Sequence, residues 1–336
     1  MAVRLLRVDA NAAIGYGHLA RMATLADELA RRGHTVWFAS QDRLDQTHWF
    51  HSAWRFLPLE AEHDLHLVAE SLQPDAIVCD LPAYDAETLA LLRAQYPLIV
   101  LDDFQAAPLP ADLLINTQMI WREAPADSGQ RVLGGPRYAL IPRRVAETPR
   151  VPPTRDLVVT LGGSDPTNLT ARVLEGLRAL EPPVTMTVIL GPGYHHRESL
   201  CDLLESYPHA VSVRAAVTDM ISVMKAHRLA VTAVGVTLYE LAACGVPAIA
   251  LAEEARHMAL ATVLESVGTL RALPASQAEV GSLAAEVACL LADSRERAAM
   301  AEAGRALLDG NGPARIADAM ERLILRRQAS TLTLAS

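Results

Sequence analysis

One local pattern recurs along most of the chain: a short apolar run, a polar or glycine-bearing turn, and then a helical segment. Residues 3–8 form the first apolar run, the loop IGYGH follows, and a helix is expected from about residue 19 to residue 32, with Gly33 ending it. HTVWFAS at 34–40 is the next predicted strand. A strand, a helix and a second strand in this order predict a parallel sheet with helices on its faces.

The pattern continues and then restarts. Apolar runs typical of buried parallel strands continue the first half. They are DAIVCDL at 75–81, PLIVLDD at 97–103 and ADLLINT at 111–117. Residues 118–155 are rich in Pro, Arg and Gly and are predicted to be a linker. DLVVTLGGSDPTN then opens a second series, with later strands in VTMTVILG, VSVRAAV, HRLAVTAV and PAIALA and a long helical tail over about 277–327.

At 336 residues the chain exceeds what one hydrophobic core usually organises. We therefore expect two Rossmann-like, doubly wound α/β domains facing a cleft, with residues 1–145 as the first, 155–325 as the second and 326–336 as a tail. Ligands of such sheets bind beyond the carboxyl ends of the strands. The loops that follow strands are thus the places to look for function.

Charge and cysteine usage narrow the function classes. The formal net charge of -9 opposes a nucleic-acid partner, although helix N-termini and a few arginines can still hold a small phosphorylated ligand. The four cysteines lie far apart, without the close pairing of a zinc or redox motif, and are expected to be free thiols. No apolar stretch is long enough for a membrane span and no signal peptide is evident, so we expect a cytoplasmic protein.

The first motif is RVDANAAIGYGHLAR at 7–21. Gly15 and Gly17 allow the backbone to approach a ligand closely at the start of a helix. His18 follows them, and an imidazole there can accept a proton from water near neutral pH. Asp9, at the end of the preceding strand, is expected to orient His18 or to organise the loop. The alternative is that His18 only caps the helix or is a partly buried polar group.

The second motif is TLGGSDPTN at 160–168. Gly162 and Gly163 make a tight turn whose backbone amides can hold a phosphate, and Ser164 or Asp165 can cap the next helix. The turn lacks the lysine of a P-loop. An ordinary strand-to-helix turn, in which the glycines serve only backbone geometry, explains this segment equally well.

The third motif is VGVTLYE at 234–240. Gly235 and Thr237 near a helix start, with Glu240 one turn later, would place a phosphate at the helix N-terminus and a carboxylate beside a ribose diol. The alternative is that Glu240 is an ordinary surface residue.

The remaining candidates point to no metal. Asp102 and Asp103 form an acidic pair at a strand end, but no cluster of histidines or further acids accompanies them. His195 and His196 follow a Gly-Pro-Gly turn and are interpreted as a solvated loop. His257, at a helix start in the second half, is a candidate sugar contact.

Taken together, these motifs resemble the UDP-sugar hydrolases of pseudaminic acid biosynthesis, which release 2,4-diacetamido-2,4,6-trideoxy-L-altrose from UDP, and the related spore-coat polysaccharide proteins. The resemblance spans most of the chain. Besides the three motifs above, the matching segments are LDDF at 101–104, LGGPRYALI at 133–141, VTDM at 217–220 and DGNGPAR at 309–315.

The resemblance implies a glycosyltransferase-like fold of the GT-B type and a reaction without metal or cofactor, in which water attacks the anomeric carbon of a UDP-linked deoxyamino sugar. It places the water-activating histidine at His18, the diphosphate near the second and third motifs, the uracil at the Met220 backbone and the ribose at Glu240. The catalytic residues expected are His18 and Asp9. The substrate contacts expected are Gly15, Gly17, Arg21, Gly163, Ser164, Asp165, Asn168, Met220, Gly235, Val236, Thr237, Glu240 and His257.

The chain departs from the family in three places. The family's Asp-His-Tyr is Asp80, Leu81, Pro82 here, which removes an aromatic hydroxyl unless Tyr84 substitutes for it. Val236 replaces a serine of the phosphate loop, and an Asn-Gln near the sugar becomes Arg256, His257. These changes suggest an altered substrate or an acceptor other than water.

Three hypotheses follow from these motifs. The first is a nucleotide-sugar hydrolase with His18 as the general base. The second is a GT-B glycosyltransferase, which would not release UDP rapidly from donor alone. The third is a non-catalytic sugar-nucleotide binding subunit, which would bind UDP without turnover.

Overall fold

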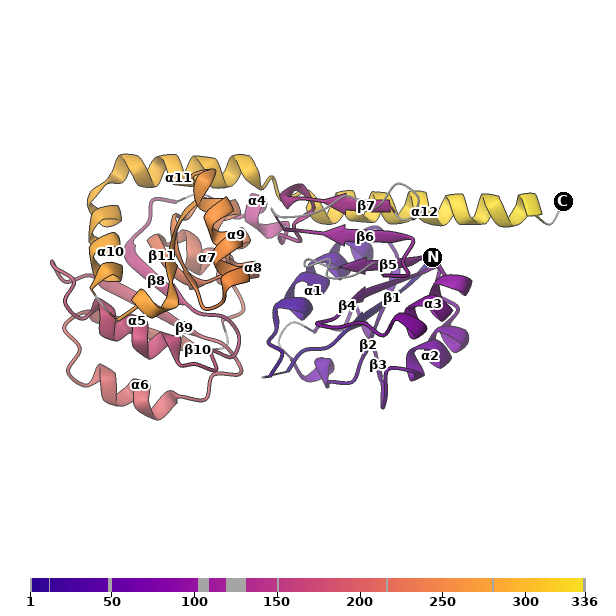
Figure 1. The fold of residues 1–336 in the computed structure, drawn as a ribbon, viewed down its shortest axis with the longest axis horizontal. Coiled ribbons are helices and arrows are strands. Elements are labelled where there is room, and N and C mark those ends of the chain that lie inside the picture. Colours follow the sequence, from indigo (N-terminus) through magenta and orange to yellow (C-terminus); the bar gives the residue numbers. More distant parts are fainter. Residues whose placement is uncertain are drawn as a thin grey trace. The chain divides into compact units, whose positions relative to one another are not determined.

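The computed structural model describes residues 2–11, 13–47, 50–101, 109–118, 131–149, 151–215, 217–279 and 281–334. The chain forms two compact units, each with its own parallel sheet and flanking helices (Figure 1). The first unit contains residues 1–14, 18–140 and 311–336, and the second contains residues 15–17 and 141–310. Within the described residues, no helix is both long and apolar enough to cross a membrane.

The first unit is built on a seven-stranded sheet in the order β3-β2-β1-β4-β5-β6-β7, and every neighbouring pair is parallel. The central strands are almost entirely buried, which explains why the sequence shows continuous apolar runs there. The strands are β1 (Val3–Val8), β2 (Thr35–Ser40), β3 (Arg55–Pro58), β4 (Ala76–Asp80), β5 (Leu98–Leu101), β6 (Leu113–Asn116) and β7 (Arg131–Gly134). The helices of this unit are α1 (Gly17–Arg31), η1 (Leu44–Gln46), α2 (Asp64–Leu72), α3 (Ala86–Gln95), η2 (Pro136–Tyr138) and α12 (Gly312–Leu334). The first residue of α1, Gly17, belongs to the short segment that is grouped with the second unit.

The second unit has a six-stranded parallel sheet in the order β10-β9-β8-β11-β12-β13. Its strands are β8 (Arg155–Thr160), β9 (Thr185–Leu190), β10 (Ala210–Ala215), β11 (His227–Ala233), β12 (Ala248–Ala252) and β13 (Leu270–Pro274). Its helices are α4 (Arg144–Glu147), α5 (Leu169–Leu177), α6 (Arg197–Leu204), α7 (Met220–Lys225), α8 (Val236–Cys244), α9 (Ala255–Ser266), η3 (Ala275–Gln277), α10 (Ser282–Ala292) and α11 (Ser294–Leu307).

The prediction of two doubly wound α/β domains is confirmed. Each sheet reverses its strand order beside its first strand, so the loops after β1 and β4 are neighbours in the first unit, and those after β8 and β11 are neighbours in the second. These are the places where such folds bind ligands. Gly33 ends α1 as expected, with φ of +86°, a conformation that glycine adopts without a side-chain penalty.

The predicted linker over 118–155 needs correction. Its described part contains β7, η2 and α4, so the chain is folded through much of this stretch. β7 and β3 were both missed because each is a four-residue strand at a sheet edge. Each lies partly exposed, and neither carries the apolar run on which the prediction relied.

The long helical tail predicted over 277–327 is three helices, and the last belongs to the other unit. The sequence assigned residues up to 325 to the second domain, whereas α12 groups with the first unit. Arg32, directly after α1, binds Asp318 and Glu321 of α12 at 2.7 and 3.0 Å, and Arg327 donates to Asp112 at 3.0 Å. The apolar face of α12 is also buried, through Ile316, Ala317, Ala319 and Met320.

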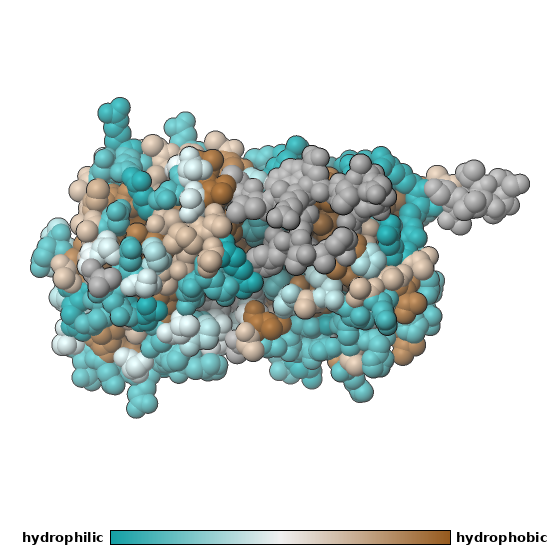
Figure 2. Space-filling view, viewed as in Figure 1, coloured by the Kyte–Doolittle hydropathy of each residue, from teal (hydrophilic) through white to brown (hydrophobic). Residues whose placement is uncertain are grey.

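On the face drawn in Figure 2, hydrophobic residues form small, separate areas among hydrophilic ones. The large apolar side chains that are exposed come from different elements, such as Leu67 on α2, Val213 on β10 and Leu325 on α12. Scattered exposure of this kind is normal for a globular surface.

If α12 stabilises the first unit, truncating its buried face will weaken that unit. We expect Met320→Ala to lower the free energy of unfolding by about 2–5 kcal/mol, because a buried side chain is replaced by a cavity. Hydrogen exchange read by mass spectrometry should accelerate in β1 and β2 and stay unchanged in β8 and β11. Leu325→Ala, an exposed position on the same helix, is the control and should change neither region. Faster exchange in β8 would contradict the assignment of α12.

Candidate functional site

The first glycine motif forms the turn between β1 and α1. Gly15 has φ of +82°, in the left-handed region that favours glycine, and α1 begins at Gly17. His18 is therefore the second residue of α1. Its side chain is 24% exposed, so one edge of the ring is accessible while the other is covered.

The covered edge of His18 meets a buried ion pair. Asp80, the last residue of β4, has a fully buried side chain and lies 2.7 Å from His18 Nδ1 through Oδ1. Arg21, one turn further along α1, donates to the same carboxylate from Nε and Nη2, each at 2.5 Å. Parallel pairing of β1 with β4 brings the end of β4 beneath the start of α1, which explains how residues so distant in sequence meet.

Asp9 does not orient His18, and that prediction was wrong. Its carboxylate accepts two hydrogen bonds from Arg7 at 2.5 and 2.6 Å, one from the Ser40 hydroxyl at 2.8 Å and one from the Gln41 amide at 2.9 Å. These contacts tie the end of β1 to the end of β2. The other expectation for Asp9, that it organises the loop, agrees with this geometry.

Asp80 was missed as the partner of His18, although the sequence carried a signal for it: an acid directly after a buried apolar run, in the strand next to β1. Burial disfavours its charge, but Arg21 and His18 outweigh that effect and hold the pKa of Asp80 below its usual range. The carboxylate therefore remains ionised and favours the tautomer in which His18 Nδ1 carries the proton. His18 Nε2, for which the described residues provide no hydrogen-bond partner, is then free to accept one from water.

Arg21 was predicted to contact the substrate, but its guanidinium faces Asp80 and the residue is buried. Tyr84 does not replace the missing aromatic hydroxyl either. Its hydroxyl donates to the Leu101 carbonyl and accepts from the Leu81 amide at 3.1 Å, and burial raises its pKa well above the usual value. Tyr84 therefore joins the ends of β4 and β5 within the sheet.

In the second unit, the turn after β8 both exposes part of its glycine backbone and supplies the carboxylate that caps the next helix. Gly162 has φ of +93°, and Gly163 and Ser164 follow it with partly exposed surfaces. Asp165 is buried and accepts hydrogen bonds from the Leu169 and Thr170 amides at 2.7 and 2.9 Å, so its carboxylate caps α5. A direct side-chain contact from Asp165 to substrate, as predicted, is not available in this arrangement.

Asn168 is also engaged within the unit. Its side chain accepts from the Tyr194 hydroxyl at 2.9 Å and donates to Ser199 at 3.3 Å. Tyr194 follows the Gly-Pro-Gly turn at 191–193, which the sequence analysis set aside together with the histidines after it. That turn packs directly on the Gly162–Gly163 turn, because the Gly193 amide donates to the Gly163 carbonyl at 2.8 Å.

The close approach of these two turns explains their glycines. A Cβ atom on Gly191 would lie 2.2 Å from the Gly163 carbonyl oxygen, which no side chain tolerates. Gly191 and Gly193, whose added Cβ atoms would both meet the Gly163 carbonyl oxygen, thus let the two strand-end loops stack. The amides of the first loop are placed by the second, a dependence that no single motif revealed.

The third motif begins α8. Gly235 is the N-cap residue in an extended conformation without a side-chain cap, and Val236 and Thr237 open the first turn with partly exposed surfaces. The adjacent strands β8 and β11 pair in parallel, so this helix start and the Gly162 turn follow neighbouring strand ends. Backbone amides at an uncapped helix start are suited to bind an anion.

Glu240 lies one turn into α8 and is the most perturbed acid of the second unit among the described residues. Burial raises the pKa of its carboxyl to about 7, and the charge of Arg144 on α4 opposes that shift. Its side chain forms no hydrogen bond or ion pair within the described part of the chain. A half-buried carboxyl without a partner is costly, which makes it a candidate ligand contact.

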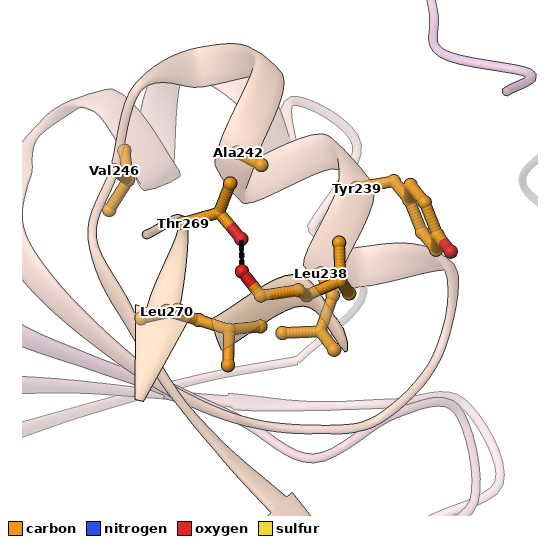
Figure 3. Close-up of a pocket in the computed structure, with 8 residues that line it drawn as sticks. Leu238, Tyr239, Ala242, Val246, Thr269 and Leu270 are labelled. Carbon is orange, nitrogen blue, oxygen red and sulfur yellow. Dashed lines mark hydrogen bonds between the residues drawn. The ribbon is translucent and has the colours of Figure 1, made fainter. Parts of the chain in front are cut away.

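The opposite face of α8 is packed against α9 and β13. Leu238 points toward Leu270, whereas the Tyr239 ring points away from it, and the Thr269 hydroxyl donates to the Leu264 carbonyl at 2.8 Å beside Leu238 (Figure 3). The space between these side chains is too small for a water molecule. It is therefore a packing junction that fixes α8, and not a ligand pocket.

The remaining predicted contacts lie on separate elements of the second unit. Met220 is the first residue of α7, whose N-cap Asp219 accepts from the Ser222 amide at 3.2 Å. His257 lies in the first turn of α9 and is half-buried. Near it, Arg256 pairs with Glu254 at 2.5 Å, and Thr167 donates to Glu253 at 2.6 Å.

The described residues contain no group of three or more His, Cys, Asp or Glu side chains that could hold a metal ion. Asp102 and Asp103, the acidic pair noted in the sequence, lie outside the described residues.

Sequence comparison finds distant relatives, and no family model matches the chain. An uncharacterized protein of Methanocaldococcus jannaschii is 22% identical over 264 residues, which are 72% of this chain and 54% of that protein. The chain thus spans about half the length of this relative. The spore coat polysaccharide biosynthesis protein SpsG of Bacillus subtilis is 25% identical over 328 residues, covering 92% of this chain and 95% of SpsG.

Solved structures with the same fold include glycosyltransferases. The spinosyn rhamnosyltransferase SpnG matches with a TM-score of 0.68 at 18% identity, covering 95% of this chain and 99% of that one. MurG of Acinetobacter baumannii matches with a TM-score of 0.66 at 16% identity, with 95% and 99% covered. HepE of Anabaena, solved with UDP-glucose, matches with a TM-score of 0.62 at 14% identity, again covering 95% and 99%. The fold is GT-B-like.

The Asp80 ion pair should be essential for the first unit. We expect Asp80→Asn to lower the free energy of unfolding at pH 7 by about 3–5 kcal/mol, because it leaves the buried Arg21 charge uncompensated. The folded-state pKa of Asp80 lies below 3.8, so the parent keeps this contribution above that pH and loses it only as the pH falls further. The loss of unfolding free energy in Asp80→Asn, measured by urea unfolding, should therefore be the same at pH 7, 5.5 and 4.5.

Asp45→Asn is the matched control, because Asp45 pairs with Arg43 on the surface of the same unit. It should change stability by less than about 1 kcal/mol. Equal effects of the two substitutions would show that the buried pair is not structurally important.

Proposed function

We propose that the protein is a metal-independent nucleotide-sugar hydrolase that releases a diacetamido-trideoxy-type sugar from UDP by attack of water at the anomeric carbon. The observation that carries the proposal is the His18–Asp80 pair, with Nδ1 held by a buried carboxylate and Nε2 left accessible. This is the arrangement of a general base. The remote similarity to SpsG supports a role in polysaccharide biosynthesis, and HepE with bound UDP-glucose supports a nucleotide-linked sugar as ligand.

The second unit is proposed to bind the nucleotide. The amides of the Gly162–Ser164 turn and of residues 235–237 at the start of α8 would hold the diphosphate. Glu240 would accept hydrogen bonds from the ribose hydroxyls, which would give its carboxyl the partner that it lacks. The Met220 backbone would contact the uracil, and His257 would contact the sugar.

The first unit is proposed to supply the base. His18 Nε2 takes a proton from water as the water oxygen forms its bond to the anomeric carbon, and the bond from that carbon to the diphosphate oxygen breaks. UDP leaves with the electron pair of that bond, stabilised by backbone amides. The imidazolium formed on His18 is stabilised by Asp80 and later returns its proton to solvent. Arg21 acts on this step through Asp80 and through its Nη2, which lies 3.3 Å from His18 Nδ1, and Gly15 and Gly17 keep the backbone close to the ligand.

A glycosyltransferase acting on a related sugar is the second candidate. It is favoured by the position of the Tyr84 hydroxyl, which is directed into the sheet and so does not replace the missing aromatic hydroxyl that would place a water. An acceptor hydroxyl would then replace water as the nucleophile. Incubation with donor alone separates the two, since a transferase would release UDP slowly until an acceptor is added.

Substitution of His18 tests the proposed base. We expect His18→Gln to slow UDP release from UDP-linked deoxyamino sugars by about a hundredfold or more, because general-base catalysis contributes at least that factor. UDP affinity measured by calorimetry should be unchanged. In ¹⁸O-labelled water, mass spectrometry should find the label in the released sugar of the parent reaction.

His66→Gln is the control, since His66 lies on α2 beside Glu70 and far in sequence from the motif. It should release UDP at the parent rate. Full activity of His18→Gln would refute the assignment of the base. UDP binding without any turnover by the parent would instead identify a non-catalytic binding subunit.

The raised pKa of Glu240 predicts that nucleotide binding depends on pH. Its pKa of about 7 means that the carboxyl is mostly protonated below pH 7 and ionised above it. A carboxylate accepts ribose hydroxyls better than a carboxylic acid does, so affinity should rise as the pH increases through 7. Calorimetry with UDP-glucose, whose diphosphate diester does not titrate in this range, should show that rise in the parent. Glu240→Gln should bind more weakly at pH 8 and show no such rise, and a pH-dependent Gln variant would exclude Glu240 as its source.

A further inference from the structure

The turn after β8 carries two consecutive backbone amides that the fold does not use. Within the described part of the chain, the N–H groups of Gly163 and Ser164 donate no hydrogen bond. Both residues keep part of their surface exposed. Successive unpaired amides can hold an anion, provided that the backbone keeps each N–H pointing in one direction. What fixes the backbone of this turn is therefore relevant to the proposed diphosphate site.

The peptide that joins Gly163 to Ser164 is oriented by the turn at 191–194. Its carbonyl, that of Gly163, accepts the hydrogen bond from the Gly193 amide at 2.8 Å. In a trans peptide the C=O and N–H groups point in opposite directions. The Ser164 N–H therefore points away from the 191–194 turn, and the Gly193 contact holds it there.

The later part of the same turn adopts a conformation that needs support. Asp165 and Asn168 have φ of +44° and +52°, in the left-handed region that is uncommon for residues with a side chain. Such conformations persist where surrounding contacts fix them. Asp165 is fixed by the two α5 amides that it caps. Asn168 is fixed from outside the turn, because the buried Tyr194 donates from its hydroxyl to the Asn168 side chain at 2.9 Å.

Both supporting contacts come from adjacent residues. Gly193 binds Gly163 through its backbone, and Tyr194 binds Asn168 through its side chain. The supporting turn is itself closed, since the Tyr194 amide donates to the Gly191 carbonyl at 3.2 Å. One short turn thus holds the β8–α5 connection near its beginning and at its end.

We propose that Tyr194 is a positioning residue for the diphosphate: with the Gly193 amide, it holds residues 162–168 in the conformation that presents the Gly163 and Ser164 amides to a nucleoside diphosphate. The inference rests on the proposed function and adds to it a support that touches no ligand. A turn that is already ordered loses little conformational freedom when the ligand binds, which increases the affinity. Loss of the support should therefore appear as weaker nucleotide binding.

The experiment compares Tyr194→Phe with Tyr207→Phe. The two substitutions are matched, because each removes one hydroxyl that donates to the α5 region and keeps the ring: Tyr194 binds the N-cap residue Asn168, and Tyr207 binds the Leu174 carbonyl within the helix. We expect Tyr194→Phe to bind UDP about 3- to 10-fold more weakly by calorimetry, the change that corresponds to one net hydrogen bond. Tyr207→Phe should bind UDP as the parent does, although both variants should lose a similar amount in melting temperature.

Hydrogen exchange read by mass spectrometry tests the turn without any ligand. The amides of Asn168, Leu169 and Thr170 are hydrogen-bonded to Asp165, so their exchange reports whether the turn stays closed. We expect faster exchange in peptides that cover these residues in Tyr194→Phe. Exchange in α8 should stay at the parent rate.

The outcomes separate this inference from the proposed function. Parent protein that binds UDP, together with equal UDP affinities of the two variants, would overturn the role of Tyr194 alone. Faster exchange in Tyr194→Phe with unchanged UDP affinity would also overturn it, because the hydroxyl would then serve only the fold. Parent protein that does not bind UDP would overturn the proposed function and the inference with it.

Discussion

Parallel pairing throughout both sheets is the constraint on which the arrangement of the molecule depends. Because every strand runs the same way within its sheet, all strand ends of one kind lie along one edge, and the loops that follow neighbouring strands meet there. In the first unit this edge brings Asp80 beneath His18, and in the second it places the Gly162 turn beside the start of α8. Residues far apart in sequence become neighbours through the strand order alone, before any specific side-chain contact forms.

The two candidate acids show how environment sets the charge of a carboxyl. Asp80 is fully buried, yet a two-point contact from Arg21 keeps it ionised, so it can hold one tautomer of His18 without becoming a proton acceptor itself. Glu240 is only half-buried and lacks such a partner, so burial raises its pKa to about 7. The first carboxyl is a fixed structural charge, whereas the second can change protonation near neutral pH. They are therefore suited to different tasks, orientation in one case and ligand contact in the other.

Much of this could be predicted from sequence where the signal is local. Continuous apolar runs identified most strands, and the glycine turns at Gly162 and Gly235 were located because each directly follows such a run, whereas Gly15 was located because it immediately precedes a helical segment. The partner of His18 could not be predicted in this way, because Asp9 and Asp80 both lie at strand ends beside it and only the geometry distinguishes them. The side-chain roles of Asp165 and Asn168 depend on capping and on Tyr194, which spacing does not reveal. The assignment of α12 failed for a similar reason, since ion pairs to Arg32 and Asp112 determine where that helix packs.

The return of α12 to the first unit has a topological consequence. The second unit, apart from residues 15–17, is one continuous stretch inserted between residues 140 and 311 of the first. The two ends of the interrupted unit touch, because a Cβ atom on Gly312 would lie 2.0 Å from the Ala139 carbonyl oxygen. A short peptide splice across this junction would therefore close the first unit as an independent chain, and the excised stretch could be produced alone. The molecule thus consists of one domain inserted into another, and the inserted domain can be exchanged during evolution while the first unit stays intact.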